Sequence, residues 1–225
     1  MIQREHIDTA HVLGGVELRL IRHDRDYMIV MGNNELMSTR KWGSEEALAT
    51  ESLKRIAHAK APHVLIGGYG MGFTLRAALA HLGQDGHVTV VELVPKIIEW
   101  ARGPMAELAA GCLDDPRVTL RMGDVAMAIG AVQGEYDAIL LDVDNGPDGL
   151  VYQGNDGLYS RDGLRAAKAA LAPGGVLAIW SAGPDPAFRR RLTKAGFSVE
   201  EIRVAARSNG KGPKHTIWFA TLQPR

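Results

Sequence analysis

Short apolar runs that alternate with helical segments constrain the fold of this chain more than any other feature. The runs lie at residues 64–66, 88–91, 118–120, 138–141 and 176–180, and the predicted helices at 73–82, 95–110, 163–171 and 186–195. Strands that are apolar throughout are typical of a parallel sheet whose two faces are both covered by helices. The alternation therefore predicts an α/β protein built on a mostly parallel sheet.

The two ends of the chain predict additional β-structure. Residues 16–38 hold short runs of alternating polarity separated by turn-forming residues, which indicates a small N-terminal β-unit. Ser44, followed by two glutamates, predicts the N-cap of a helix that runs to about Ala59. Near the C-terminus, strands at 198–206 and 215–222 flank a glycine-rich turn and predict an antiparallel hairpin. We therefore expect a β-unit at 1–43 and a larger α/β domain at 44–225 with a seven-stranded sheet.

The charge balance argues against several classes of partner. Lys plus Arg and Asp plus Glu number 26 each, so no overall field attracts nucleic acid or an anionic membrane. The first residues lack the apolar core of a signal peptide, and no apolar run approaches the ~20 residues that cross a bilayer. The single cysteine, Cys112, has no partner for an internal disulfide. We expect a cytoplasmic protein with no nucleic-acid partner and no membrane partner.

A glycine-rich turn follows the first apolar strand of the α/β region, in the run Ile66 to Gly72. Glycines at such a strand–helix junction let the chain turn tightly and let a ligand approach the backbone, while the helix N-terminus supplies free N–H groups. We predict that Gly68, Tyr69, Gly70 and Gly72 bind a cofactor there. A purely structural tight turn is the alternative.

Acidic residues end the next two strands. Glu92 falls about 20 residues after the glycines, the spacing at which an acid accepts both ribose hydroxyls of an adenosine ligand. We therefore predict that Glu92 and its neighbour Leu93 bind the cofactor. Gly123, Asp124 and Val125 follow the third strand, where Asp124 is placed to accept from the adenine amine. The alternatives are that Glu92 only caps the helix from Pro95 and that Asp124 is only an N-cap.

The glycine spacing separates two kinds of adenosine cofactor. Dinucleotide sites usually show Gly-x-Gly-x-x-Gly with a second nucleotide-binding half, whereas this chain has Gly68-x-Gly70-x-Gly72. The terminal hairpin is the ending of S-adenosylmethionine (SAM)-dependent transferases. The pattern thus favours SAM, or a close relative such as decarboxylated SAM, over NAD.

The same segments resemble a known family. The stretches HVLIGGYGMGFTLRAAL, VTVVELVPKIIEWAR, DDPRVTLRMGDVAMAI and YDAILLDVDNGPDGL resemble the spermidine synthase-like branch of the class I SAM-dependent methyltransferase superfamily. The resemblance implies a Rossmann-like fold, in which Asp142 faces the substrate amine and helps to remove its proton. It also implies that Glu46 is the family's glutamate, and that subunits pair into a homodimer through their N-terminal strands.

Several positions depart from the family pattern. The family's loop aspartate is Gly70 here, a glutamine of the N-terminal unit is Glu35, and the second aspartate after the fourth strand is Asn145. The Tyr-His pair ahead of Glu46 reads Ser44–Glu45. The positions that hold adenosine persist while several that hold the polyamine do not, which indicates a retained cofactor site with an altered substrate or reaction.

The acids after the fourth strand suggest the chemistry. Asp142 and Asp144 are the predicted catalytic residues, because a carboxylate beside the sulfonium can orient an amine and take its proton. Asp142, like Gly123 and Val125, is also predicted to contact the cofactor. Glu46, Asn145 and Tyr152 are predicted to bind the substrate, a small and cationic acceptor. No metal is expected, since Ser181–Gly183 replaces the Asp-Asn pair that metal-dependent relatives carry after the fifth strand.

Three functions remain open at this point. Our first hypothesis is a SAM-dependent methyltransferase that acts on a small amine. The first alternative is an aminopropyltransferase of the spermidine synthase type, which uses decarboxylated SAM and a diamine. The second is a SAM-binding protein without catalytic activity.

Overall fold

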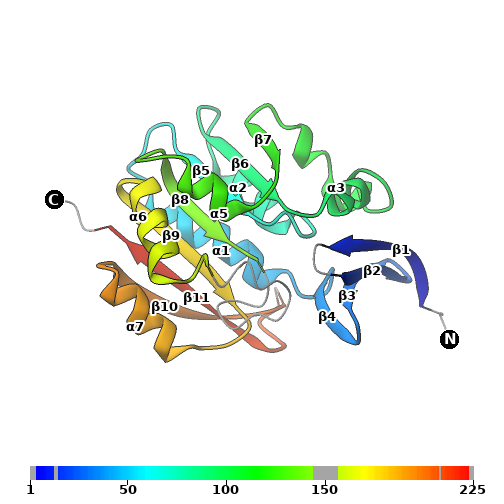
Figure 1. Ribbon diagram of the computed structural model, residues 1–225. Helices are drawn as coiled ribbons and strands as arrows, with labels where there is room; N and C mark the ends of the chain where they lie inside the picture. Colours follow the sequence, from blue (N-terminus) through cyan, green and yellow to red (C-terminus); the bar gives the residue numbers. More distant parts are fainter. Residues whose placement is uncertain (1–3, 13–14, 144–156, 208, 223–225) are drawn as a thin grey trace.

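The computed structural model describes residues 4–12, 15–143, 157–207 and 209–222. Within them the chain forms a four-stranded sheet and a seven-stranded sheet (Figure 1). The small sheet is built from β1 (Glu5–Val12), β2 (Val16–His23), β3 (Asp26–Met31) and β4 (Asn34–Ser38). The strands of the large sheet are β5 (His63–Gly67), β6 (His87–Glu92), β7 (Val118–Met122), β8 (Tyr136–Leu141), β9 (Leu171–Ser181), β10 (Ser198–Ala205) and β11 (Lys214–Thr221). The predicted α/β class is confirmed.

The helices alternate with the strands of the large sheet. They are α1 (Gly43–Arg55), α2 (Phe73–His81), α3 (Pro95–Arg102), α4 (Ala106–Ala109), α5 (Val125–Gly130), α6 (Arg161–Ala170) and α7 (Pro186–Lys194), with a short 3₁₀ turn, η1 (Cys112–Asp114). The strand order is β10-β11-β9-β8-β5-β6-β7. The β9-β8-β5-β6-β7 pairs are parallel, while β11 is antiparallel to both β9 and β10. The predicted seven-stranded sheet with a C-terminal hairpin is therefore confirmed.

Successive residues of each central strand face opposite sides of the sheet, and both sides are apolar. Val64 and Ile66 of β5 join one buried cluster that includes residues of α1, α2 and α3. Leu65, between them, joins a second cluster with residues of α5, α6 and α7. Because side chains alternate along a strand, an uninterrupted apolar run supplies both cores at once.

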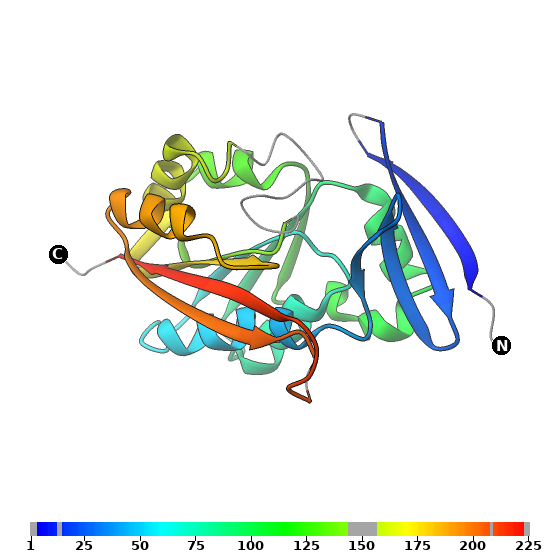
Figure 2. The same cartoon turned by 90° about the horizontal axis from the view of Figure 1, so that it is seen from below.

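The small sheet stands at one end of the molecule, with antiparallel order β1-β2-β3-β4 (Figure 2). Its strand β1 was not predicted, since Glu5–Val12 mixes His, Asp and Thr with few apolar residues, as suits an exposed edge. Ala10, Leu20 and Ile29 of this sheet are buried in the same cluster as Leu48 of α1. One core therefore joins the small sheet to the rest, and the division at residue 43 stays a prediction.

Several predicted boundaries are wrong. The helix expected at 95–110 breaks after Arg102, because Gly103 favours the helical state poorly and Pro104 lacks the N–H that the helix needs. α1 ends at Arg55 rather than near Ala59, and β9 begins at Leu171 rather than at residue 176.

Ser44 is not the N-cap of α1. The helix begins at Gly43, its N-cap residue is Trp42, and its side chain makes no capping hydrogen bond within the described residues. Ser44 is instead fully buried and bonded to two aromatic residues of the large sheet. The Ser44 hydroxyl therefore makes tertiary hydrogen bonds instead of the capping hydrogen bond that the sequence pattern predicts.

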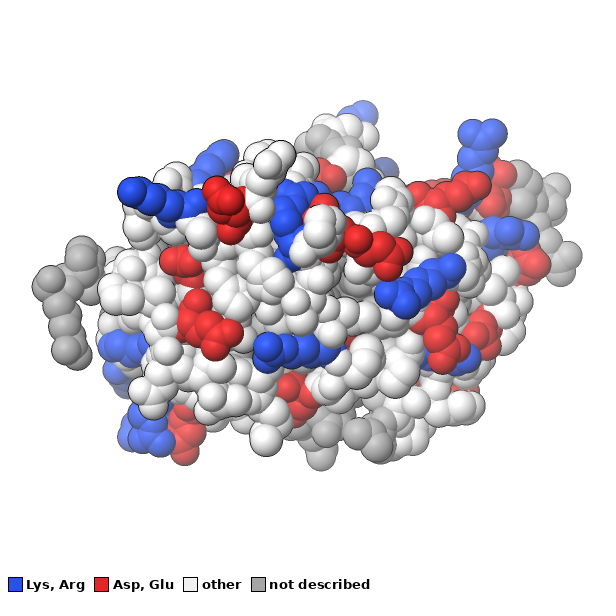
Figure 3. Space-filling model, turned by 90° about the horizontal axis from the view of Figure 1, so that it is seen from above, with Lys and Arg blue, Asp and Glu red and all other residues white. Residues whose placement is uncertain are grey.

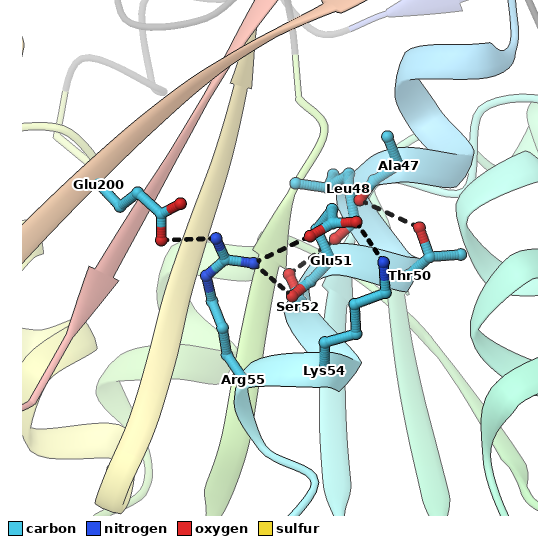
Figure 4. Close-up of polar contacts among 8 residues, drawn as sticks. All are labelled: Ala47, Leu48, Thr50, Glu51, Ser52, Lys54, Arg55 and Glu200. Atoms are coloured by element: carbon cyan, nitrogen blue, oxygen red, sulfur yellow. Dashed lines mark hydrogen bonds and ion pairs between the residues drawn. The ribbon is translucent and has the colours of Figure 1, made fainter.

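The C-terminal end of α1 is fastened to the hairpin strands through Arg55 (Figure 4). Its guanidinium donates to the backbone oxygen of Glu51 at 2.7 Å and to Glu200 Oε2 of β10 at 2.6 Å. It also lies over the ring of Phe219 in β11, 3.7 Å from the centroid. These contacts hold the C-terminal end of α1 against β10 and β11.

Candidate functional site

A cavity of about 380 Å³ opens where the carboxyl ends of β5, β6, β8 and β9 face the small sheet. This volume lies in the range of small-molecule sites. One wall is Val12, Leu18, Glu35, Leu36, Met37 and Lys41 from the N-terminal region. We call Gly68, Gly70, Glu92, Leu93 and Gly123–Val125 the glycine side, and Glu45, Asp142, Trp180, Ala182, Pro213 and His215 the tryptophan side. The cavity thus lies at the carboxyl ends of the parallel strands, where open α/β sheets bind their ligands.

The glycine turn is shaped by close approach between strand ends. Gly68 has φ +85°, and a Cβ there would lie 2.8 Å from the backbone oxygen of Asp142. Its N–H donates to the backbone oxygen of Val91 at 2.9 Å. Gly70 has φ +57° and sits under Met37 of β4, whose Sδ would be 3.3 Å from an added Cβ. Only glycine combines these angles and distances, so backbone rather than side chain forms this part of the cavity.

Glu92 ties the turn to the start of the following helix. Its Oε2 accepts from the Tyr69 N–H and its Oε1 from the Val94 N–H, both at 2.8 Å. Burial raises the pKa of Glu92 above its usual range although these backbone hydrogen bonds oppose the shift. The N–H groups of Gly70 and Leu93 also favour the charged carboxylate, and because Glu92 lines the cavity its oxygens can accept ligand hydroxyls.

Asp124 likewise combines two roles. Its Oδ1 accepts from the Ala126 N–H at 2.8 Å and caps α5, while the residue itself lines the cavity. The cap occupies one oxygen and leaves Oδ2 for a ligand amine. The two interpretations that the sequence left open, cap and ligand contact, are geometrically compatible.

Asp142 follows β8, in the middle of the parallel strands, and is partly buried. Its Oδ2 lies 3.2 Å from Oγ1 of Thr74, which is in the first turn of α2. Burial raises the pKa of Asp142 to about 6, against the opposing effect of the Thr74 hydrogen bond. Burial and the negative charges of Asp142 and Glu46 raise the pKa of Glu45 well above its usual range. Two carboxylates that disfavour each other's charge thus share the cavity.

A hydrogen-bonded chain forms the far wall of the tryptophan side. Trp180 Nε1 donates to Ser44 Oγ at 3.0 Å, and Ser44 Oγ lies 2.8 Å from His215 Nδ1. Ser44 Oγ thus accepts from the indole N–H and shares a second hydrogen bond with His215 Nδ1. Burial and then the charge of Lys41 lower the pKa of His215, which keeps it neutral at neutral pH.

The cavity is acidic although the chain as a whole carries no net charge. Among the described lining residues, Glu35, Glu45, Glu92, Asp124 and Asp142 face the single cation Lys41. Lys41 is itself engaged, since its Nζ lies 2.9 Å from Glu35 Oε1. On the outer face drawn in Figure 3, by contrast, basic and acidic residues are interspersed. The local excess of carboxylates favours a cationic ligand.

Most of the predicted cofactor residues meet at this cavity, but two do not line it. Gly68, Gly70, Glu92, Leu93, Gly123, Asp124, Val125 and Asp142 do. Tyr69 turns its buried side chain towards Cys112, 3.6 Å from Oη to Sγ, and only its N–H serves the site. Gly72 is the N-cap of α2, where a Cβ would lie 2.6 Å from Tyr69 Oη. Both residues shape the turn from behind.

Of the predicted substrate-binding residues, only Glu46 lies in the part of the chain that the structure describes. Glu46 lines a separate depression with Arg76 and His81, and the structure does not bring it to the cavity. Its neighbour Glu45 lines the cavity instead. Asp144, Asn145 and Tyr152 lie outside the described residues.

The sequence reasoning missed Glu45, Trp180 and His215. Trp180 stands next to the end of β9, so its position at a strand's carboxyl end was an available signal. Glu45 was passed over because the register of the family motif selected Glu46. Nothing local marked His215, which meets Ser44 across 171 residues of chain.

The described residues hold neither a metal-ligand cluster nor a membrane-spanning helix. No group of three or more His, Cys, Asp or Glu side chains in the part of the chain that the structure describes is arranged to hold a metal ion. None of the helices there is long and apolar enough to cross a membrane.

The chain is similar to proteins of one family. Residues 46–190 match the family model described as spermine/spermidine synthase domain. A polyamine aminopropyltransferase of Mycobacterium tuberculosis (strain H37Rv) is 31% identical over 198 residues, which cover 84% of this chain and 36% of the relative. One from Nitrosomonas europaea is 33% identical over 127 residues, 56% of this chain and 37% of that protein. Putrescine N-methyltransferase 2 of Nicotiana attenuata is 38% identical over 115 residues, 51% of this chain and 29% of that protein.

Solved structures share the fold. The spermidine synthase from Thermotoga maritima superposes with a TM-score of 0.75 at 20% identity, over 96% of this chain and 72% of that one. A spermidine synthase in complex with the transition state analogue AdoDATO gives 0.74, also at 20% identity and with the same coverage of both chains. The predicted Rossmann-like SAM-dependent methyltransferase fold is therefore confirmed. The chain spans well under half the length of the curated relatives that it matches.

Proposed function

The chain belongs to the spermine/spermidine synthase family, and from that premise we propose that it transfers an aminopropyl group from decarboxylated SAM to a small amine. This reverses the order of our two enzymatic hypotheses from the sequence. The observation that carries the proposal is the excess of carboxylates around Asp142 among the described residues of the cavity, where the one cation, Lys41, is already paired.

The charge of the donor decides between the hypotheses. Decarboxylated SAM carries a sulfonium and an ammonium but no carboxylate, whereas SAM adds a carboxylate that needs a cation or backbone N–H groups. The five acids and the one engaged lysine among the described lining residues favour the donor without the carboxylate. The family relatives called polyamine aminopropyltransferases support the same choice.

The glycine side would hold the adenosine part of the donor. Gly68 and Gly70 present backbone, Glu92 can accept the ribose hydroxyls, and Asp124 Oδ2 suits the adenine amine. A Cβ at Gly68 would meet the Asp142 backbone oxygen and one at Gly70 would meet Met37, so backbone alone borders the cavity at both positions. This geometry fits an adenosine ligand.

The chemistry is an in-line substitution, for which the donor supplies a carbon activated by the sulfonium. Asp142 accepts a proton from the bound ammonium, which frees the lone pair of the amine. The amine nitrogen then forms a bond to that carbon as the carbon–sulfur bond breaks, and the electron pair stays on sulfur. Trp180 and His215 wall the tryptophan side and limit how the amine can lie, which contributes through orientation.

Methyl transfer from SAM is the second candidate. It is favoured by Gly70, which stands where the family's loop carries an aspartate that holds the aminopropyl end of the donor. The similarity to a putrescine N-methyltransferase supports it as well. In this reaction Asp142 and the tryptophan side would keep the same tasks.

Product analysis separates the two reactions. The purified protein is incubated with putrescine and either donor, and the products are identified by mass spectrometry. Spermidine and methylthioadenosine formed from decarboxylated SAM support the proposal. N-Methylputrescine formed from SAM supports the second candidate, and donor binding without either product supports the non-catalytic alternative. Homodimer formation, cytoplasmic location and the roles of Asp144, Asn145 and Tyr152 stay predictions.

A further inference from the structure

We infer that Glu45 is a second acceptor-positioning carboxylate, which shares one proton with Asp142 in the ligand-free protein and exchanges it for the ammonium of the acceptor. The inference rests on the proposed function, since it concerns the amine that is to be alkylated. It goes beyond the family pattern, which has a histidine rather than an acid in the register of Glu45.

The two carboxylates reach the cavity from different elements. Glu45 lies in the first turn of α1, and Asp142 follows β8. The hydroxyl of Thr74 in α2 lies between their segments, 3.2 Å from Asp142 Oδ2 and 3.4 Å from the backbone oxygen of Glu45. Both acids line the tryptophan side of the cavity. An ammonium that enters there meets both.

The backbone of Glu45 is held on both sides of the residue. Ser44, directly before it, is bonded to Trp180 and His215, and the Gly43 N–H donates to the backbone oxygen of Ala206 at 2.9 Å. The other end of α1 is fastened through Arg55 (Figure 4). Glu45 therefore has little freedom to withdraw from Asp142 when the cavity is empty.

Neither acid has a cationic partner within the described residues. Glu45 forms no side-chain hydrogen bond or ion pair there, and the side chain of Asp142 contacts only the neutral hydroxyl of Thr74. Partly buried carboxylates without a cation are costly in their charged form. The raised pKa values of both groups express that cost, and a shared proton lowers it.

The other charged groups around Glu45 and Asp142 do not supply the missing cationic partner. Glu46 on α1 adds negative charge, and Glu35 and Glu92 line the same cavity. Lys41 is engaged by Glu35, and His215 is kept neutral by burial and by Lys41. The ammonium of the acceptor is then the cation that completes the site.

The proton balance is simple. When the ammonium binds, the shared proton leaves for solvent, and the two carboxylates face one positive charge. The ammonium next returns a proton to the pair and becomes the neutral nucleophile. Nitrogen bonds to the donor carbon, the carbon–sulfur bond breaks with its electrons on sulfur, and the product departs as a secondary ammonium. The pair again holds one proton.

Calorimetry in two buffers of different ionisation enthalpy counts the protons released. The protein is loaded with methylthioadenosine and titrated with putrescine at pH 6.5, as wild type, Glu45→Gln and Glu46→Gln. We expect release approaching one proton for the wild type and for Glu46→Gln, which alters the neighbouring acid outside the cavity. Glu45→Gln should release less than half of that and bind putrescine about tenfold more weakly. Equal release from Glu45→Gln and the wild type, or no release from the wild type, overturns the inference.

A ligand-free measurement makes the test independent of the probe. The free energy of unfolding is followed from pH 4 to pH 7.5 for the same three proteins. Relative to Glu45→Gln, the wild type should lose stability as the pH rises and the shared proton is removed, and Glu46→Gln should do so to a smaller extent, because the charge of Glu46 contributes to the raised pKa of Glu45. Parallel curves for Glu45→Gln and the wild type overturn the inference. If methylthioadenosine does not bind, the proposed function is wrong. The pH dependence of the unfolding free energy then still tests whether Glu45 and Asp142 share a proton.

Discussion

The glycine side and the tryptophan side of the cavity are built on different principles. On the glycine side, Glu92 and Asp124 each accept backbone N–H groups from their own or the adjoining strand end. On the tryptophan side, no backbone N–H in the described part of the chain donates to the side chain of Glu45 or of Asp142, and both residues line the cavity. Backbone hydrogen bonds hold the first pair in place at the edge of the cavity, while the second pair is left to titrate and to meet the substrate.

The difference also concerns distance along the chain. The glycine side comes from strand ends that follow one another between β5 and α5. The tryptophan side joins α1, β8, β9 and β11, and its hydrogen-bonded chain spans 171 residues. The glycine side depends on contacts between nearby strand ends, so it can persist while the tryptophan side changes. Such a cavity can keep its adenosine ligand and change its acceptor.

Removal of the carboxylate of Asp142 should have the largest effect. Asp142→Asn keeps the shape and the Thr74 contact but cannot take a proton, so we expect kcat to fall by about 10² to 10⁴. The Kd of the donor should change by less than about threefold, because the glycine side is untouched. Steady-state kinetics and donor titration check both numbers. A fall in donor affinity equal to that in kcat would erase the distinction between the two sides.

A substitution at Gly68 tests whether the glycine side requires the close approach of its backbone to Asp142. Gly68→Ala places a Cβ 2.8 Å from the Asp142 backbone oxygen at φ +85°, which should destabilise the fold by about 2–3 kcal/mol and abolish donor binding. Gly83→Ala is the matched control, because no atom lies within 4 Å of its added Cβ. Urea denaturation of both variants measures the difference. Equal stability of the two would show that the close approach at Gly68 relaxes freely.

The pH dependence of stability separates the titrating acids from the paired ones. The pKa of Asp142 rises from an ordinary 3.8 to about 6 on folding, so its charge opposes folding above about pH 4, and increasingly up to pH 6. Asp142→Asn should therefore stabilise the protein at pH 7 by about 2 kcal/mol, and hardly at all at pH 4.

Asp115 provides the opposite sign. Its ion pair with Arg117 lowers the pKa of this carboxyl to about 2, so its contribution is present above its ordinary pKa and is lost as the pH falls towards 2. Asp115→Asn should lower the unfolding free energy at pH 7. Thermal melts of both variants at pH 4 and pH 7 give the comparison, and a shared sign at pH 7 would contradict it.

Asp124 should give the smallest effect on stability. Asp124→Asn keeps the cap of α5 and should change the unfolding free energy by less than about 0.5 kcal/mol, whereas Asp124→Ala should cost about 1 kcal/mol. Both should weaken adenosine binding several-fold if Oδ2 serves the ligand. Denaturation measures the cap and calorimetry measures the ligand contact. Unchanged affinity in both variants would reduce Asp124 to a cap alone.

Local sequence patterns were sufficient to predict most of the large sheet and of the glycine side. The apolar runs predicted the large sheet, and the glycines and strand-end acids were found from spacing alone, because each depends on residues a few positions apart. The broken helix after Arg102 and the edge strand β1 escaped prediction, since neither carries a strong periodic signal.

What the sequence by itself determined is the α/β fold and the glycine side, where Gly68, Glu92 and Asp124 stand at the ends of successive parallel strands. The choice of Glu45 over Glu46, and the partnership of Ser44 with Trp180 and His215, were decided only by the tertiary structure. The physical reason is that neighbouring residues on a helix point in different directions. Which of them faces the cavity depends on how α1 is anchored against β9, β10 and β11, and no local pattern records that contact.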